Sequence, residues 1–215
     1  MSATPVIPPA VVTGWWATAP MPFTDRQRAL LLQIARQSIE HGLRYGVPLN
    51  VDTRQFDQRL TDNGACFVTL HQDGQLRGCI GSLEARRPLI EDVAENAFAA
   101  AFRDPRFKPL QHDELIDLCI DISLIHPPQS LPVSSEQQLL KELQPAIDGL
   151  ILEDGRHRGT FLPSVWESLP EPAEFIRQLK RKAGLPVDYW SDTLKVWRYT
   201  TECFGERDDR RRTSS

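Results

Sequence analysis

The chain has 215 residues, of which 40% are hydrophobic and 25% charged, and its formal net charge is −4. This composition is typical of a soluble globular protein with one large domain or two unequal lobes. The negative net charge argues against a protein whose whole surface binds nucleic acid, because such binding depends on Lys and Arg neutralising phosphates. A local basic patch remains compatible with the composition.

The cysteines indicate the compartment. The chain has four cysteines, Cys66, Cys79, Cys119 and Cys203, and they are far apart in the sequence. They form no C-x-x-C pair and have no Cys/His spacing typical of zinc sites. Scattered free thiols favour a reducing cytoplasm. The first cationic side chain is Arg26, and no apolar run reaches the roughly 18 residues of a membrane span. We therefore expect a cytoplasmic protein with no membrane anchor, and no motif predicts a metal or a cofactor.

The N-terminal part predicts an arm followed by a helix. Residues 1–22 contain five prolines and little periodicity, which indicates an irregular arm that Trp15 and Trp16 would fix in place. A capping-box pattern at Thr24 opens a run with helical apolar spacing that continues to Gly42. We predict the first helix over this run.

The middle of the chain predicts a hairpin, a helix and a strand. The runs ACFVTL and QLRGCIGSL flank the turn Asp73-Gly74, which is a strong hairpin signal. Pro88 suits a helix start, and the apolar stripe that follows should end at Asp104-Pro105. The run LCIDISLI at residues 118–125 alternates apolar and polar side chains like a half-buried strand.

The C-terminal part predicts a second set of elements. Ser135 is a candidate helix cap, a hairpin crosses Gly155, and a helix ends at Gly184. The run TLKVWRYTTECF predicts one last strand, and residues 206–215 form a polar tail. Hairpins separated by helices favour an α+β fold, with a mixed or antiparallel sheet covered by helices.

The stretch LRGCIGSL is the first candidate for a site. Glycine within a strand marks a bulge, a bend or a close approach, and Gly78 and Gly81 flank a thiol here. If the stretch is extended, Arg77 and Cys79 share a face, and a guanidinium near a thiol favours the nucleophilic thiolate. The alternative is that Cys79 is a small buried hydrophobic residue, as free cysteines often are.

A second group of candidates consists of cations and their neighbours: Arg103, Asp104 and Arg106 in FRDPRF, the turn Arg158-Gly159-Thr160, and Lys182. Arginine suits bidentate contacts to phosphate or carboxylate groups. The same residues also fit structural roles, because cations are favoured at the carbonyl end of a helix and Asp104 can pair with a neighbouring arginine. Both interpretations stay open at this stage.

The order of LRGCIG, AFRDPRF, RGTFLP, FIRQLKRKAGLP and VWRYT resembles the AMMECR domain family, from about Thr24 to Phe204. It is most similar to the bacterial branch grouped as protein A of the AmmeMemoRadiSam system, named alongside a Memo-like protein and a radical SAM protein. The resemblance implies a domain over residues 23–205 with a larger lobe, a smaller lobe and a cleft between them. Family members differ in that many prokaryotic ones have a cysteine where this chain has Lys180.

The resemblance also implies which residues form the site. The matching positions are Arg77, Gly78, Cys79, Gly81, Arg103, Asp104, Arg106, Gly159, Thr160 and Lys182. From it we expect Cys79 in the cleft as a catalytic candidate, and the other positions around a small anion or RNA. We also expect Cys79 to be the most reactive thiol, with Cys119 and Cys203 shielded by packing.

Three functions are consistent with these features. The first is an accessory or substrate-handling component that works with a Memo-like protein and a radical SAM enzyme. Since the chain has no C-x-x-x-C-x-x-C run to hold an iron–sulfur cluster, radical chemistry would belong to the partner. The second is a stand-alone enzyme with Cys79 as its nucleophile, and the third is a nucleotide- or RNA-binding module.

Overall fold

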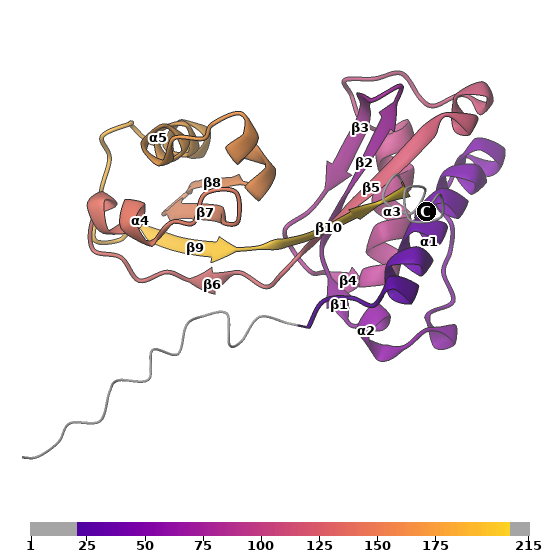
Figure 1. Ribbon diagram of the computed structural model, residues 1–215, viewed down its shortest axis with the longest axis horizontal. Helices are drawn as coiled ribbons and strands as arrows, with labels where there is room; N and C mark the ends of the chain where they lie inside the picture. Colours follow the sequence, from indigo (N-terminus) through magenta and orange to yellow (C-terminus); the bar gives the residue numbers. More distant parts are fainter. Residues whose placement is uncertain (1–20, 207–215) are drawn as a thin grey trace, which may run out of the picture.

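Two four-stranded antiparallel sheets, each covered by helices, organise residues 21–206 into two lobes (Figure 1). The structure is a computed structural model that describes residues 21–206. Trp15, Trp16 and nearly all of the expected arm and tail therefore lie outside the described residues. The α+β class predicted from the sequence is confirmed, and every strand pair in the described part of the chain is antiparallel.

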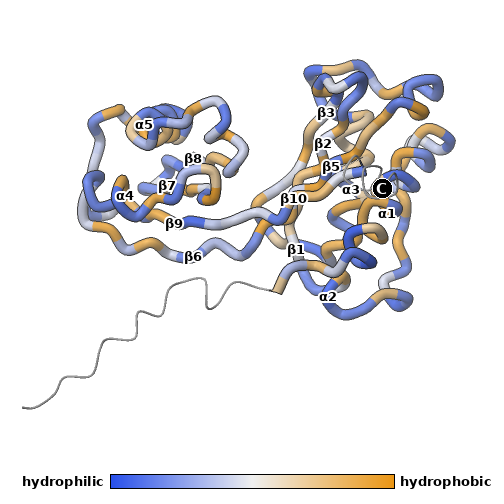
Figure 2. Tube along the Cα trace, viewed as in Figure 1, coloured by the Kyte–Doolittle hydropathy of each residue, from blue (hydrophilic) through white to orange (hydrophobic). Residues whose placement is uncertain are grey.

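The larger lobe is built on a sheet with the strand order β10-β5-β2-β3. Its strands are β2 (Cys66–Gln72), β3 (Gln75–Gly81), β5 (Leu118–Ile125) and β10 (Thr201–Gly205). The helices α1 (Asp25–Tyr45) and α3 (Leu89–Phe102) cover one face, and α2 (Gln58–Thr61) and the short strands β1 (Asn63–Gly64) and β4 (Arg87–Pro88) close one end. Hydrophobic residues gather on α3 and on the strands beneath it (Figure 2).

The first helix begins where the sequence predicts but ends later. Thr24 and Gln27 form the expected capping box. The helix continues past Gly42 to Tyr45 and ends at Gly46, which has a left-handed conformation with φ of 72°. Gly42 is instead a contact point, since a Cβ atom there would lie 2.4 Å from the ring of Phe102. Because Gly42 has no side chain, α1 and α3 can pack closely at this point.

The smaller lobe is built on a sheet with the order β6-β9-β7-β8. Its strands are β6 (Gln129–Ser130), β7 (Gly149–Asp154), β8 (His157–Phe161) and β9 (Lys195–Tyr199). The helices α4 (Glu136–Glu142) and α5 (Pro172–Ala183) complete a second hydrophobic core that includes Trp166, Phe175 and Leu179. The Ser135 cap, the hairpin across Gly155 and the Gly184 helix end are confirmed.

The prediction of a single last strand is wrong. The run from Leu194 to Phe204 divides at Thr200, and β9 pairs in the smaller sheet whereas β10 pairs in the larger one. The backbone N–H of His126, at the other crossing between the lobes, donates to the Thr200 carbonyl over 3.0 Å. The two lobes are therefore joined by two neighbouring segments, Thr200 and the stretch after Ile125.

None of the helices within residues 21–206 is long and apolar enough to cross a membrane.

Candidate functional site

A cavity of about 380 Å³ lies between the lobes. The larger lobe contributes Phe67, Gly81 and the loop 82–84, and the smaller lobe contributes the segment 158–160 and Lys182. Four of the positions that the resemblance assigns to the site therefore lie around one cavity: Gly81, Gly159, Thr160 and Lys182.

A second cavity of about 440 Å³ lies beside the first. It is lined by Ser123, Thr201 and Cys203 from the larger lobe and by residues of the smaller lobe that include Trp166. Residues that pair directly across neighbouring strands lie on the same face of a sheet. One such row crosses the four strands of the larger sheet and consists of Cys203, Ser123, Phe67 and Gly81. This row forms the floor of both cavities. We call the two cavities together the inter-lobe cleft.

Lys182 is the cation that best fits a ligand-binding role in the cleft. Its ammonium group lies 5.1 Å from the centre of the Phe161 ring. Within residues 21–206, no carboxylate oxygen lies within 4 Å of the Lys182 ammonium group. Arg158 differs, because its guanidinium is 3.2 Å from Glu84 and 3.5 Å from Glu153. Among the described residues, the first cavity is lined by the two cations Lys182 and Arg158 and by the carboxylate of Glu84, whereas the second cavity is lined by Glu167 and no cation.

Thr160 is held by a hydrogen-bond network under the cleft. Its hydroxyl donates to the Leu150 carbonyl over 2.8 Å and lies 3.1 Å from the Tyr199 hydroxyl. The Tyr199 hydroxyl donates in turn to the Phe161 carbonyl over 3.0 Å. Burial raises the pKa of Tyr199 to about 12, so this tyrosine remains protonated at neutral pH. The network fixes the part of β8 that lines the cleft.

The two glycines beside Cys79 have different roles. A Cβ atom on Gly78 would lie 2.2 Å from the backbone oxygen of Ala100 in α3, so Gly78 allows the helix to touch the sheet. A Cβ atom on Gly81 would lie 2.3 Å from the carbonyl oxygen of Cys66. Gly81 lines the cleft, whereas Gly78 faces the opposite side and serves packing.

The FRDPRF segment caps the free edge of β3. The backbone N–H of Cys79 donates to Asp104 over 2.9 Å, and the Arg106 guanidinium lies 3.4 Å from the Cys79 carbonyl oxygen. Arg106 also donates to Asp104 through its backbone N–H and its guanidinium. These contacts hold the pKa of the Asp104 carboxyl far below its ordinary value. Because β3 is an edge strand, they satisfy backbone groups that would otherwise be unpaired.

The remaining arginines bind carboxylates within their own lobe. Arg77 donates to Glu114 over 2.7 and 3.0 Å, and this contact lowers the pKa of Glu114. Arg103 lies 3.1 Å from Glu95. Four cations were expected around one anion, namely Arg77, Arg103, Arg106 and Lys182. Of these, only Lys182 lines the cleft.

Cys79 is on the helix-free face of the larger sheet but lines neither cavity of the cleft. It shares a row with Thr69 and Asp121, next to the row that forms the cleft floor. The Thr69 hydroxyl donates to the Cys79 sulfur over 3.4 Å. The expectation that Cys203 is shielded by packing is wrong, since Cys203 is exposed. It lies on β10, the other edge strand, and points toward the cleft.

We expect iodoacetamide to label Cys203 fastest and Cys66 slowest, with Cys79 and Cys119 between them. Cys66 is fully buried, and burial together with the nearby Asp92 carboxylate raises the pKa of its thiol, so the reactive thiolate is rare. Mass spectrometry of the native protein after timed labelling measures the order. Faster labelling of Cys79 than of Cys203 would contradict the exposure of these two side chains.

Sequence reasoning missed Ser123 and Cys203 as cleft residues. The alternation in LCIDISLI placed Ser123 on the polar face of its strand, so a signal was present. That face borders the smaller lobe as well as solvent, which the alternation alone does not indicate.

The fold and the cleft define a two-lobed α+β protein with a small cavity system between the lobes. The AMMECR1 family model matches residues 32–204 of the chain, and the chain belongs to this family. The span agrees with the resemblance seen in the sequence motifs.

Individual relatives agree with this assignment. Protein MJ0810 of Methanocaldococcus jannaschii is 34% identical over 195 residues, which cover 87% of this chain and 94% of that protein. A Thermotoga maritima protein is 37% identical over 166 residues, which cover 76% of this chain and 90% of that protein. Among solved structures, the uncharacterized protein PH0010 from Pyrococcus horikoshii is similar to this chain, with a TM-score of 0.76 and 31% sequence identity. The match covers 86% of this chain and 93% of that protein's chain.

Proposed function

We propose that this chain is a substrate-handling protein that holds a small anionic group in the inter-lobe cleft, and that it has no chemistry of its own at this site. The observation that carries the proposal is Lys182, a cleft cation with no carboxylate within 4 Å among the described residues. A lysine ammonium binds phosphate or carboxylate groups as a point charge with three donors. Arg158 lies on the same wall but pairs with Glu84 and Glu153, so the proposal rests on Lys182.

The partners are the second part of the proposal. The chain acts with a Memo-like protein and a radical SAM enzyme, in line with the resemblance of its motifs to the AmmeMemoRadiSam branch. Purification of the tagged full chain under gentle lysis tests this part. Recovery of neither partner, in cells that express both, would contradict it.

The two alternative functions have less support in the geometry. For Cys79 to act as a nucleophile it needs a base that takes the proton of its thiol. Among the described residues, the side-chain hydrogen bond to its sulfur comes from the Thr69 hydroxyl, which is not a base. For an RNA-binding module the arginines should be free for phosphates, whereas Arg77 and Arg103 bind carboxylates.

We expect phosphate-containing anions to raise the melting temperature of the protein, because a ligand that binds only the native state stabilises it. At ten times its Kd such a ligand adds about 1.4 kcal/mol, or roughly 3–6 °C for a chain of this size. The probes are inorganic phosphate, pyrophosphate, ADP and a short RNA. The response should fall in Lys182→Gln and persist in Lys141→Gln, which removes an exposed lysine in α4.

Lys182 also lies in the last turn of α5, where a cation favours the helix carbonyl end. The melting temperature of ligand-free Lys182→Gln is therefore the baseline for its own titration. The cleft proposal is wrong if no anion stabilises the wild type at millimolar concentration, or if Lys182→Gln responds as strongly as the wild type.

A further inference from the structure

The two cavities of the inter-lobe cleft adjoin on two sides. On the floor, Phe67 in the first cavity pairs directly across the strands with Ser123 in the second. On the side of the smaller lobe, the segment 158–160 lines the first cavity, and the segment 162–164 that follows it lines the second. One ligand can therefore occupy both cavities without leaving the cleft.

The row of residues on the floor sets the length of such a ligand. Neighbouring strands lie about 4.8 Å apart, so the row from Gly81 to Cys203, which crosses the four strands, is about 14 Å long. The first cavity gives way to the second between Phe67 and Ser123, which is the middle of the row. Each cavity therefore has room for one half of the ligand.

The two cavities differ in their chemistry. The first cavity contains the cations described above, whereas the described residues that line the second include the Glu167 carboxylate and no cation. On its floor, the hydroxyls of Ser123 and Thr201 lie 3.3 and 3.5 Å from the Cys203 sulfur, so these polar groups bond to one another. Most of its other lining residues are apolar: Pro145, Ala146, Leu162, Pro163, Trp166 and Pro170. The second cavity therefore suits an uncharged apolar group.

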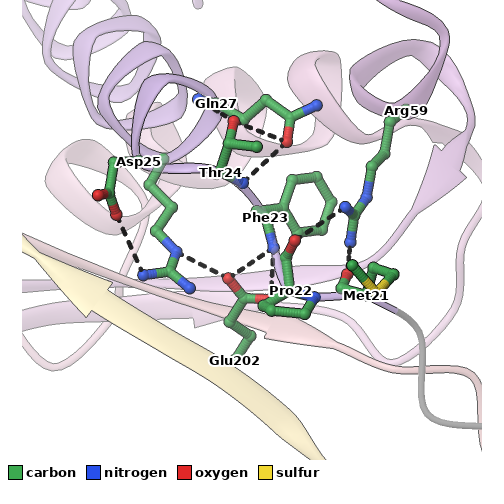
Figure 3. A network of polar contacts seen from close by, with 9 residues as sticks. Met21, Pro22, Phe23, Thr24, Asp25, Gln27, Arg59 and Glu202 are labelled. Atoms are coloured by element: carbon green, nitrogen blue, oxygen red, sulfur yellow. Dashed lines mark hydrogen bonds and ion pairs between the residues drawn. The ribbon is translucent and has the colours of Figure 1, made fainter.

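The floor of the second cavity is held in place from behind. Thr201 and Cys203 lie on β10, and Glu202 between them points to the opposite face of the sheet. Glu202 accepts hydrogen bonds from the Phe23 N–H over 3.1 Å and from the Arg28 guanidinium over 2.8 Å (Figure 3). These bonds fix the edge strand β10 to the start of α1. A cavity that is formed before binding costs its ligand less free energy.

We propose that the ligand of the cleft is an amphiphile with one anionic group, which binds at Lys182, and an uncharged alkyl or aromatic body, which fills the second cavity. This inference rests on the function proposed above and names the class of ligand. The volume of the second cavity, about 440 Å³, is typical of small-molecule sites. The body of the ligand buries apolar surface against Leu162 and Trp166, and Glu167 repels a second anionic group.

The test compares methyl phosphate and hexyl phosphate, which carry the same anionic group, by calorimetric titration of the full-length protein. Each buried methylene strengthens binding about fourfold, so we expect hexyl phosphate to bind at least about tenfold more tightly than methyl phosphate. Hexanediol bisphosphate has the same chain length but a phosphate at both ends. It should lose this gain, because its second phosphate would lie beside Glu167.

Cys203→Trp fills the second cavity and leaves Lys182 in place. Cys203 is exposed, so the melting temperature should change little. The variant should bind methyl phosphate like the wild type and lose at least about fivefold in affinity for hexyl phosphate. The matched control is Gln75→Trp, because Gln75 is exposed on the same sheet and lines neither cavity. If Cys203→Trp does not fold, Ser164→Trp replaces it, since Ser164 is another exposed residue of the second cavity.

Protection of a thiol gives an independent measurement. Saturating hexyl phosphate should slow the labelling of Cys203 by iodoacetamide, because the alkyl chain covers its sulfur, whereas saturating methyl phosphate should not. Unchanged labelling with hexyl phosphate would overturn the inference.

The titrations separate this inference from the function on which it rests. Equal Kd values for methyl and hexyl phosphate would overturn the inference and leave the anion site at Lys182 intact. A preference for hexyl phosphate that persists in Cys203→Trp and Ser164→Trp would overturn it as well. If neither ester binds, or if Lys182→Gln binds both like the wild type, the proposed function fails and the inference fails with it.

Discussion

The Gly78→Ala variant is expected to lose about 3 kcal/mol of unfolding free energy or more. A Cβ atom at this position would lie 2.2 Å from the Ala100 backbone oxygen and 3.1 Å from the carbon of the same carbonyl. Overpacking of a core costs roughly 1–3 kcal/mol when side chains can adjust, and here the obstacle is the backbone of a buried helix. The helix α3 must therefore move away from β3. Urea denaturation followed by circular dichroism measures the loss.

Leu76→Ala provides the matched control for this variant. Leu76 lies on the same strand but is 43% exposed, so its truncation should cost less than about 1 kcal/mol. If Gly78→Ala were as stable as the wild type, α3 could not contact the sheet at Gly78 as described.

We expect Asp104→Asn to cost roughly 2–4 kcal/mol at neutral pH. The Asp104 carboxylate is 4% exposed and accepts hydrogen bonds from the Cys79 N–H, the Arg106 N–H and the Arg106 guanidinium. An amide can accept fewer of these bonds and carries no charge, so buried donors lose their partner. The Arg106 side chain is 54% exposed, and solvent therefore reduces the purely ionic part of the loss.

The same variant has an expected pH dependence. The folded protein holds the pKa of Asp104 far below the ordinary value of 3.8, so the charged carboxylate stabilises the fold fully above that value. This stabilisation is lost as the pH falls toward the folded-state pKa. The difference in unfolding free energy between wild type and Asp104→Asn should therefore be constant from pH 6 to pH 8 and shrink below about pH 4.

The control for Asp104→Asn is Asp73→Asn, in the turn of the β2–β3 hairpin. Asp73 has φ of 50°, a conformation that asparagine tolerates equally well. Its unfolding free energy should change by less than about 0.5 kcal/mol. A similar small change in Asp104→Asn would contradict the role of FRDPRF as a cap on the edge of β3.

The elements of the fold that depend on local pattern could be predicted from the sequence. The Thr24 capping box, the hairpin across Asp73-Gly74 and the alternation of residues 118–125 each appear where expected. These features depend on residues close together in the chain. Gly42 was predicted as a helix end because local propensity cannot show that α3 lies against it. The division of the last strand at Thr200 likewise depends on which sheet each half meets.

The candidate site was harder to predict because charges have partners from distant segments. Glu114 follows Arg77 by 37 residues, and nothing in the local sequence indicates that the two side chains meet. Asp104 was recognised as a possible partner for a neighbouring arginine, and it does bind Arg106. Cys203 was not predicted as a cleft residue. The smaller lobe that faces it is formed by the residues between β5 and β10, and nothing in the local sequence around Cys203 indicates that this lobe lies opposite it.

The central claim is that Lys182 binds an anion in the inter-lobe cleft, and a calorimetric titration with pyrophosphate tests it most directly. The wild type and Lys141→Gln should bind with equal Kd. Loss of a charged hydrogen bond costs roughly 1.5–3 kcal/mol, so Lys182→Gln should bind about 10-fold to 100-fold more weakly. A Kd for Lys182→Gln equal to that of the wild type, or no heat of binding in any of the three proteins, would contradict the claim.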